Sequence, residues 1–235
     1  MAQFELNGVN LRVPAPLMTK RIRERLTDGR YETSEARAVK AMVRPGDTVL
    51  DLGSGVGYIA ALAARRAGPE NVVTVEANPA LQEVIRTNLD ANGCKKTVSL
   101  QGAVMGKGAP GDKVTLSIGH AFWAASVTGV PGQVHATAEV AVLQLADLMA
   151  QYDPSIVMMD IEGAEETMFD APWPDTVRAL TLELHPKRYT GGTLKRIFDC
   201  MSASGLIYAP EVSRGALVGF CREGLGLDGL PVDLD

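Results

Sequence analysis

From Asp47 onward, short apolar runs alternate with segments of helical periodicity, and this alternation constrains the fold more than any other feature. Repeated β-α units of this kind build a parallel sheet. The expected strands cover residues 48–52, 72–75, 98–100, 156–159 and 179–184. These runs are apolar throughout, which is typical of a sheet that helices cover on both faces.

The C-terminal part departs from a purely parallel pattern. Strands are expected near Ile207 and over residues 216–221, and only a short turn at 210–215 separates them. Parallel strands need a longer crossover, so this last pair must form an antiparallel hairpin. The sequence therefore predicts an α/β, Rossmann-like fold: a seven-stranded, mostly parallel sheet with a C-terminal antiparallel hairpin and helices on both faces.

The helix after the second strand has the clearest boundaries. Asn78 can cap its first amides, Pro79 suits the first turn, and Gly93 can end the helix. A later helix ends near Gly205. Both predictions support the β-α alternation.

The N-terminal segment precedes the sheet. Residues 4–13 flank Asn7-Gly8 with apolar residues and indicate a hairpin, and helices are expected near 17–26 and 34–43. We expect residues 1–45 to cap one edge of the active-site cleft and residues 46–235 to form the main domain, with one domain overall. The glycine-rich stretch 103–141 carries no recognised signature. Trp123 within it is expected near a substrate pocket, and a place in the domain core is the alternative.

Composition narrows the choice of partner. The chain has 23 Lys and Arg against 28 Asp and Glu, a formal charge of −5, so nucleic acid is not expected as a partner. One basic group stands out on a short expected helix: Lys20, Arg21, Arg23 and Arg25. It is interpreted as a solvated helix face, with a site for an acidic substrate or lipid headgroup as the alternative.

Sorting signals and cysteine motifs are not evident. The first residues lack the basic start and apolar stretch of a secretion signal, and no apolar run is long enough to cross a bilayer. We therefore expect a cytoplasmic protein without a membrane partner. Cys94, Cys200 and Cys221 have no Cys-x-x-Cys spacing, which favours neither a disulfide framework nor a zinc cluster.

The strongest local signal is Val49-Leu-Asp51-Leu-Gly53-Ser-Gly55-Val-Gly57, a strand that enters a glycine-rich turn before a helix. Such glycines let a ligand approach the backbone. A nicotinamide dinucleotide would need the third glycine one residue later. The Asp51 carboxylate would repel a pyrophosphate but attract the ammonium of S-adenosylmethionine, so Asp51, Gly53 and Gly55 are candidate contacts for that cofactor.

Two further positions complete the expected cofactor site. Glu76 ends the second strand about 20 residues after the glycine turn, where an acidic side chain can accept hydrogen bonds from a ribose diol. A surface glutamate without function is the alternative. Gln101 ends the third strand and is expected at the edge of the adenine pocket, by its position alone.

Acidic residues and a histidine follow the fourth and fifth strands. Asp160, Glu162 and Glu165 come after the fourth strand, and Glu183 and His185 after the fifth. Adjacent parallel strands bring these side chains to one edge, where they can form a general base or a site for a hard metal ion. A structural, hydrogen-bonded histidine is the alternative for His185, and a preference for helix starts is the alternative for Glu165 and Glu166.

The order of these segments resembles the FkbM-type family of methyltransferases. The matching pieces are Tyr31-Glu32, Arg44-Pro-Gly-Asp-Thr-Val-Leu-Asp-Leu-Gly53, Val75-Glu-Ala-Asn-Pro79, Asp160-Ile-Glu-Gly-Ala-Glu165 and Leu182-Glu-Leu-His-Pro186. The chain departs from the family at Gly55, where Asn is frequent, and at Met158, where Lys is frequent. The resemblance implies a class I methyltransferase fold and methylation of a hydroxyl oxygen, usually on a sugar or a secondary metabolite.

By this resemblance, Glu32, Asp51, Gly53 and Glu76 would contact the cofactor, and Asp160, Glu183 and His185 would face its methyl group. The expected activity is S-adenosylmethionine-dependent O-methylation of a small molecule or glycan, with His185 or Glu183 as base, or with a divalent cation held by Asp160, Glu183 and His185. A nicotinamide-dependent oxidoreductase and a non-catalytic cofactor-binding subunit remain the alternatives.

Overall fold

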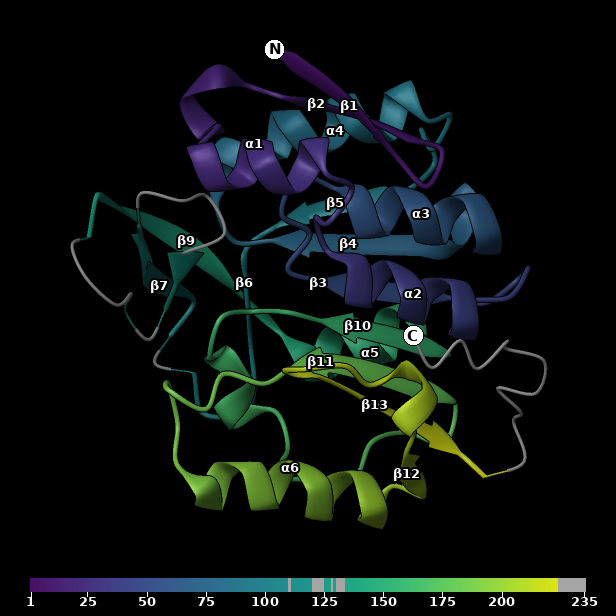
Figure 1. The fold of residues 1–235 in the computed structure, drawn as a ribbon. Helices are drawn as coiled ribbons and strands as arrows, with labels where there is room; N and C mark the ends of the chain where they lie inside the picture. Colours follow the sequence, from purple (N-terminus) through teal and green to yellow (C-terminus); the bar gives the residue numbers. More distant parts are fainter. Residues whose placement is uncertain (110, 120–124, 128, 130–133, 224–235) are drawn as a thin grey trace.

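The computed structural model describes residues 1–109, 111–119, 125–127, 129 and 134–223. These residues form a main sheet of seven strands, a separate four-stranded sheet and an N-terminal two-stranded hairpin (Figure 1). Helices lie on both sides of the main sheet. In the part of the chain that is described, no helix has the length and apolar character needed to span a bilayer.

The main sheet has a strand order that reverses at its centre. Its strands are β3 (Val49–Leu52), β4 (Val72–Glu76), β5 (Val98–Gln101), β10 (Ile156–Met159), β11 (Ala179–Glu183), β12 (Leu206–Tyr208) and β13 (Leu217–Arg222). The spatial order is β12-β13-β11-β10-β3-β4-β5. Only β13 runs against its neighbours, β11 and β12. The predicted α/β, Rossmann-like arrangement, with a seven-stranded, mostly parallel sheet and a closing antiparallel hairpin, is confirmed.

Successive residues of the central strands enter two different cores, because side chains of a strand alternate between its faces. Val49 and Ile156 pack on the side of α1 (Lys20–Thr27), α2 (Thr33–Met42), α3 (Tyr58–Ala67) and α4 (Gln82–Ala91). Leu50 and Val157 pack on the side of α5 (Leu145–Tyr152) and α6 (Gly191–Ala203). Both faces are apolar, which explains why these strands show no polar alternation.

The helix predicted after the second strand is present, with a tighter first turn. The Asn78 side chain accepts a hydrogen bond from the Ala80 amide at 3.1 Å, and residues Pro79–Leu81 form a 3-10 turn before α4 begins. Gly93 follows the helix with a φ of +74°. The cap and stop signals therefore mark this helix correctly.

The N-terminal hairpin comprises β1 (Ala2–Leu6) and β2 (Val9–Val13). Asn7 and Gly8 both have positive φ, as a tight hairpin turn requires. The hairpin packs on α4, where the Asn88 side chain accepts from the Arg12 amide at 2.7 Å. Of the segment 1–45, it is therefore α1 and the start of α2 that lie at the cleft, where Arg21 and Glu32 line a cavity.

The glycine-rich stretch forms the four-stranded sheet, in the order β6-β9-β7-β8. Its strands are β6 (Ala103–Met105), β7 (Lys113–Ile118), β8 (Ala125–Ser126) and β9 (Ala136–Gln144). Leu116, Ala125 and Ser126 from this sheet line the cavity next to the glycine turn. The run from His120 to Trp123 lies outside the described residues, so the expected place of Trp123 stays a prediction.

Candidate functional site

The glycine turn after β3 joins the ends of three strands. The amides of Gly53 and Ser54 donate to the Val75 carbonyl of β4, at 2.9 and 3.1 Å. Gly53 has a φ of +94°, and a Cβ placed there would lie 1.7 Å from the Asp160 carbonyl oxygen. Only glycine can occupy this position without displacing the backbone after β10. The turn thus fixes the relative positions of β3, β4 and the acidic segment after β10.

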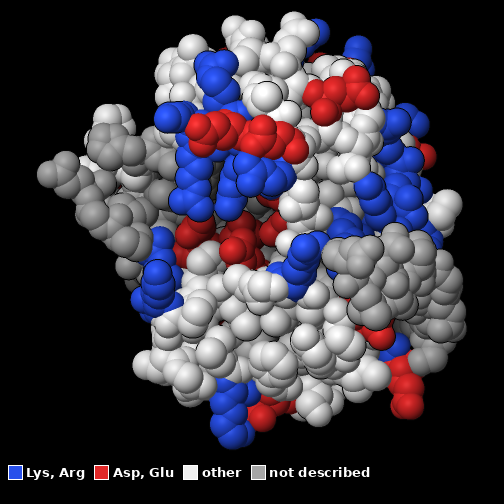
Figure 2. Space-filling model, in the orientation of Figure 1, with Lys and Arg blue, Asp and Glu red and all other residues white. Residues whose placement is uncertain are grey.

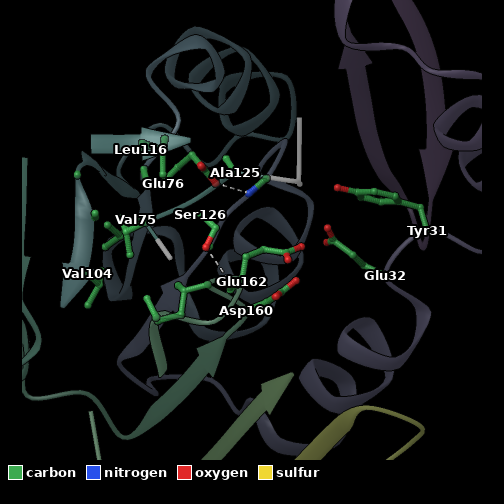
Figure 3. Close-up of a pocket in the computed structure, with 18 residues that line it drawn as sticks. Tyr31, Glu32, Val75, Glu76, Val104, Leu116, Ala125, Ser126, Asp160 and Glu162 are labelled. Atoms are coloured by element: carbon green, nitrogen blue, oxygen red, sulfur yellow. Dashed lines mark hydrogen bonds between the residues drawn. The ribbon is translucent and has the colours of Figure 1, made fainter. Parts of the chain in front are cut away.

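Glu76 lies at the end of β4, buried beside the first cavity (Figure 3). Its carboxylate accepts hydrogen bonds from the amides of Asn78 at 2.8 Å and Gly55 at 2.9 Å. Burial raises the pKa of Glu76 to about 7, despite these two bonds. A carboxylate has about four acceptor positions, so Glu76 can still accept from ligand hydroxyls.

Asp51 lies within β3 and lines a second cavity. Burial raises the pKa of Asp51 to about 6, although the Thr74 hydroxyl donates to the carboxylate at 2.6 Å. Three residues line both this cavity and the first: Glu32, Gly53 and Asp160. The predicted contacts Asp51, Gly53, Gly55, Glu76 and Glu32 therefore line two neighbouring cavities at the ends of β3 and β4.

Two glutamates of the cleft have a left-handed backbone. Glu32 has a φ of +46° and Glu162 a φ of +55°. Among the described residues that are not glycine, only Asn7 and Asp153 share positive φ, and Asn and Asp tolerate it best. The carboxylates of Glu32, Asp160 and Glu162 point toward one another across the cavity (Figure 3). Strained backbone at a cavity is typical of a functional site.

The three predicted catalytic residues lie together. Asp160, Glu183 and His185 each offer a ligand atom, and these atoms lie within 4.8 Å of one another. His185 Nε2 is 3.6 Å from carboxylate oxygens of both Asp160 and Glu162. The register of β10 and β11 explains this arrangement, because adjacent parallel strands end at the same edge.

Glu165 lies behind His185 and was not among the expected catalytic residues. Its side chain is fully buried, and its Oε1 lies 3.3 Å from His185 Nδ1. The second oxygen of Glu165 and Asp160 Oδ1 are buried without a hydrogen-bond partner. Unpaired buried oxygens are costly, so they indicate where a proton or a ligand group binds.

The electrostatics of this group favour retained protons. Burial works to lower the pKa of His185, but Glu165 and Glu162 outweigh it and raise that pKa. Burial and the neighbouring Glu183 and Glu162 raise the pKa of Asp160 well above its usual value. The surroundings of both side chains therefore favour the protonated form.

Gln101 lies apart from these cavities. Its side chain is exposed, and its amide donates to the Ala77 carbonyl at 3.1 Å. Gly102 and Ala103 line the first cavity in its place. Sequence position alone does not distinguish which of these residues reaches the cavity, because the backbone turns sharply between β5 and β6.

The cavities match S-adenosylmethionine in several respects. A ribose can bind at Glu76, a cationic ammonium at Asp51, and the cofactor can approach the backbone at Gly53, where no Cβ intervenes. Asp160, which has one buried carboxylate oxygen without a hydrogen-bond partner, also lines the first cavity. The residues present therefore fit this cofactor.

Comparison with known proteins supports a methyltransferase. The family model of the TRM5/TYW2 methyltransferase domain matches residues 29–114. An arginine N(omega)-methyltransferase from Streptomyces achromogenes subsp. streptozoticus is 39% identical over 77 residues, which are 33% of this chain. The match spans only 21% of that relative's length. These findings support S-adenosylmethionine-dependent methyl transfer as the class of activity, but not the FkbM-type family in particular.

Solved structures of methyltransferases are also similar at low identity. The precorrin-6y C5,15-methyltransferase of Geobacter metallireducens has a TM-score of 0.45 and 14% identity, covering 85% of this chain and 78% of that one. A TehB-like methyltransferase from Corynebacterium glutamicum has a TM-score of 0.45 and 12% identity, with coverage of 87% and 95%. TYW2 from M. jannaschii, solved with AdoMet, has a TM-score of 0.43 and 11% identity, with coverage of 94% and 85%.

Proposed function

We propose that the chain is an S-adenosylmethionine-dependent methyltransferase that binds its cofactor at the ends of β3, β4 and β10. One observation carries the proposal. The glycine turn lies against the backbone of Asp160 and directs the Gly55 amide to Glu76, so one cavity combines a backbone approach, a ribose acceptor and an acidic floor. A phosphate-rich dinucleotide would be repelled by the carboxylates at this edge.

Different residues would bind different parts of the cofactor. Glu76 accepts the ribose hydroxyls, and Asp51 attracts the amino-acid ammonium from the second cavity. Bound S-adenosylmethionine supplies a methyl group activated by its positive sulfur. The protein then has to align the acceptor, exclude water and remove a proton as the new bond forms.

The proton goes to the group around His185. With Glu165 behind its Nδ1, His185 presents Nε2 toward Asp160 and Glu162, where an acceptor would lie. In an alternative version, Asp160, Glu183 and His185 hold a divalent cation that lowers the acceptor pKa. We favour the metal-free version, because a histidine is a less usual ligand than oxygen for a hard divalent cation.

Two classes of acceptor suit the site. A hydroxyl oxygen of a sugar or small metabolite is supported by the presence of an imidazole at the methyl-facing edge. A cationic nitrogen, such as a guanidinium, is supported by the acidic floor, since Glu32, Asp160 and Glu162 converge on one point. The name of the arginine methyltransferase relative agrees with the second class. We favour the nitrogen acceptor, because a neutral hydroxyl gains little from so many carboxylates.

The proposal is tested by titrating the full chain with S-adenosylmethionine and with NAD in a calorimeter. S-adenosylmethionine should bind and NAD should not. Glu76→Ala should weaken the binding of S-adenosylmethionine by about 1–3 kcal/mol, the range for hydrogen-bonded polar groups. Glu83→Ala is the matched control, because Glu83 is exposed on α4 and outside the cavities.

An analogue without the ribose diol separates a lost contact from a damaged fold. It should bind to wild type and to Glu76→Ala with equal affinity. If Glu76→Ala retained wild-type affinity for the complete cofactor, the ribose contact would lie elsewhere. Binding of NAD in preference to S-adenosylmethionine would refute the proposal.

A further inference from the structure

An outer cavity opens above the acidic floor, and arginines surround its entrance. Arg21 and Arg25 of α1, Arg30 before α2 and Arg214 before β13 all line it. Figure 2 shows acidic side chains at the bottom of a hollow with Lys and Arg around its edge. The sequence favoured a solvated helix face for the basic group on α1, with a site for an acidic ligand as the alternative. Two members of that group, Arg21 and Arg25, line a cavity.

Three of these arginines are available to a ligand. Arg30 forms an ion pair with Asp28. For Arg21, Arg25 and Arg214, no carboxylate lies within ion-pair distance among the described residues, and all three are exposed. Arg21 and Arg25 are one helical turn apart on α1, so they project from the same face. Paired guanidinium groups recognise carboxylate or phosphate oxygens well.

The floor of the same cavity has the opposite charge. Glu32, Asp160, Glu162 and Glu183 line it below the arginines. One oxygen of Asp160 is buried and lacks a hydrogen-bond partner. A ligand with a single charge would satisfy only one end of this cavity, whereas a ligand with one charge of each sign would satisfy both.

We propose that the outer cavity holds the methyl acceptor as a small zwitterion, with its carboxylate or phosphate at Arg21, Arg25 and Arg214 and its cationic nitrogen at the floor. This inference rests on the proposed function and specifies its substrate class. A long nucleic acid would place phosphates over the acidic floor, which the charges of Glu32, Asp160 and Glu162 disfavour.

The reaction balances with the residues present. The bond between sulfur and methyl carbon breaks, and its electron pair stays on sulfur, which becomes a neutral thioether. The cationic nitrogen first loses one proton to the group of Asp160, Glu162 and His185, and from there the proton passes to water. The electron pair of that N–H bond stays on nitrogen and forms the new bond to the methyl carbon.

Matched pairs of probes test the inference with the full chain and saturating S-adenosylmethionine. The carboxylate pairs are arginine with agmatine and lysine with cadaverine, and the phosphate pair is O-phosphoethanolamine with ethanolamine. At least one zwitterion should be methylated, with a KM at least about tenfold below that of its partner without the anionic group. The pair that shows this difference identifies the anion.

Arg21→Gln and Arg25→Gln should each raise the KM for that zwitterion about tenfold and leave its kcat nearly unchanged. The KM of the partner probe that lacks the anionic group should also stay nearly unchanged. Arg23→Gln, on the same helix but outside the cavity, should behave as wild type. Equal KM values within every pair, or equal losses for both partners in the variants, would overturn the inference. So would methylation of total tRNA or a basic peptide with none of the six probes modified.

Calorimetric titration with S-adenosylmethionine distinguishes a failure of the zwitterion inference from a failure of the proposed function. If wild type and the arginine variants bind the cofactor but methylate no probe, the zwitterion inference fails while the proposed function stands. If wild type does not bind the cofactor, the proposed function itself fails.

Discussion

Several carboxyl groups lie close together at the cleft, and their surroundings raise their pKa values. Burial and Glu35 raise the pKa of Glu32 well above its usual value, and burial and neighbouring charges do the same for Asp160. Glu32 also keeps a left-handed backbone that glycine would adopt more easily. Clustered carboxyl groups with raised pKa values in a cavity are typical of a functional site.

The charges around His185 predict how the proposed catalysis depends on pH. Burial alone would lower its pKa, but Glu165 and Glu162 raise it, so a basic His185 requires a higher pH than free imidazole. The acidic limb of kcat/KM should therefore lie above about 6.5. Glu165→Gln keeps the shape but removes the charge, and it should move that limb to lower pH. The pH profile of methyl transfer measures both effects.

A chelator separates the base from a metal site in the same assay. If His185 is the base, chelator leaves turnover unchanged, and Glu166→Gln, a change at the exposed neighbour of Glu165, leaves the pH profile unchanged. Loss of turnover with chelator and recovery with magnesium would instead show that Asp160, Glu183 and His185 hold a cation. A limb that stays in place in Glu165→Gln would exclude His185 as its origin.

Local sequence signals predicted the elements that carry the proposed cofactor site. The glycine spacing after β3 and the caps of α4 depend on neighbouring residues, and the structure has both. Asp160 and His185 could be placed together because parallel strands end at one edge. The strands β6 and β9 pair in parallel although Ala103 and Val142 are far apart in sequence, and periodicity carries no information on such pairing.

At the scale of the turn, Gly53→Ala should be much more harmful than a glycine replacement with similar backbone angles. Its Cβ would lie 1.7 Å from the Asp160 carbonyl oxygen, so either β3 or the segment after β10 must move. We expect a loss of about 2–5 kcal/mol in the free energy of unfolding, from left-handed backbone and overpacking together. Denaturant unfolding followed by circular dichroism measures this loss.

Gly46→Ala is the control for backbone strain. Gly46 has a φ of +85°, and a Cβ there would meet nothing within 4 Å. This variant should lose only about 1–2 kcal/mol, the contribution of the left-handed conformation. Equal losses in the two variants would mean that the close approach between the turn and Asp160 does not contribute to stability.

The whole molecule brings opposite charges into one cavity from distant parts of the chain. Arg21 and Arg214 are separated by almost the entire sequence, yet both line the outer cavity. The sequence indicated the acidic floor, because its residues follow adjacent strands. For Arg21 and Arg25 it left an acidic-ligand site only as the alternative to a solvated helix face, and it gave no sign of Arg214, because these positions depend on how α1 and the turn before β13 pack around the sheet.

The buried carboxylates also predict how the stability of the unliganded protein changes with pH. Burial raises the pKa of Asp51 to about 6 and that of Glu76 to about 7. Between the unfolded values, near 4, and these folded values, the folded state binds more protons than the unfolded state. The contribution of these two groups to the free energy of unfolding should therefore be greatest below about pH 4 and should fall as the pH rises to about 7. The raised pKa of His185 adds a loss in the same direction above about 6.5.

Glu76→Gln isolates one part of this slope. Glutamine cannot titrate, so the variant should lose less stability between pH 5 and pH 8, by about 3 kcal/mol at most, since each pKa unit corresponds to about 1.4 kcal/mol. Glutamine also changes the bonds to Gly55 and Asn78, but that effect is the same at every pH and does not alter the slope. Glu83→Gln removes an exposed carboxylate and should keep the wild-type slope. Denaturant unfolding at several pH values measures all three proteins, and identical slopes for wild type and Glu76→Gln would mean that Glu76 is ionised without penalty.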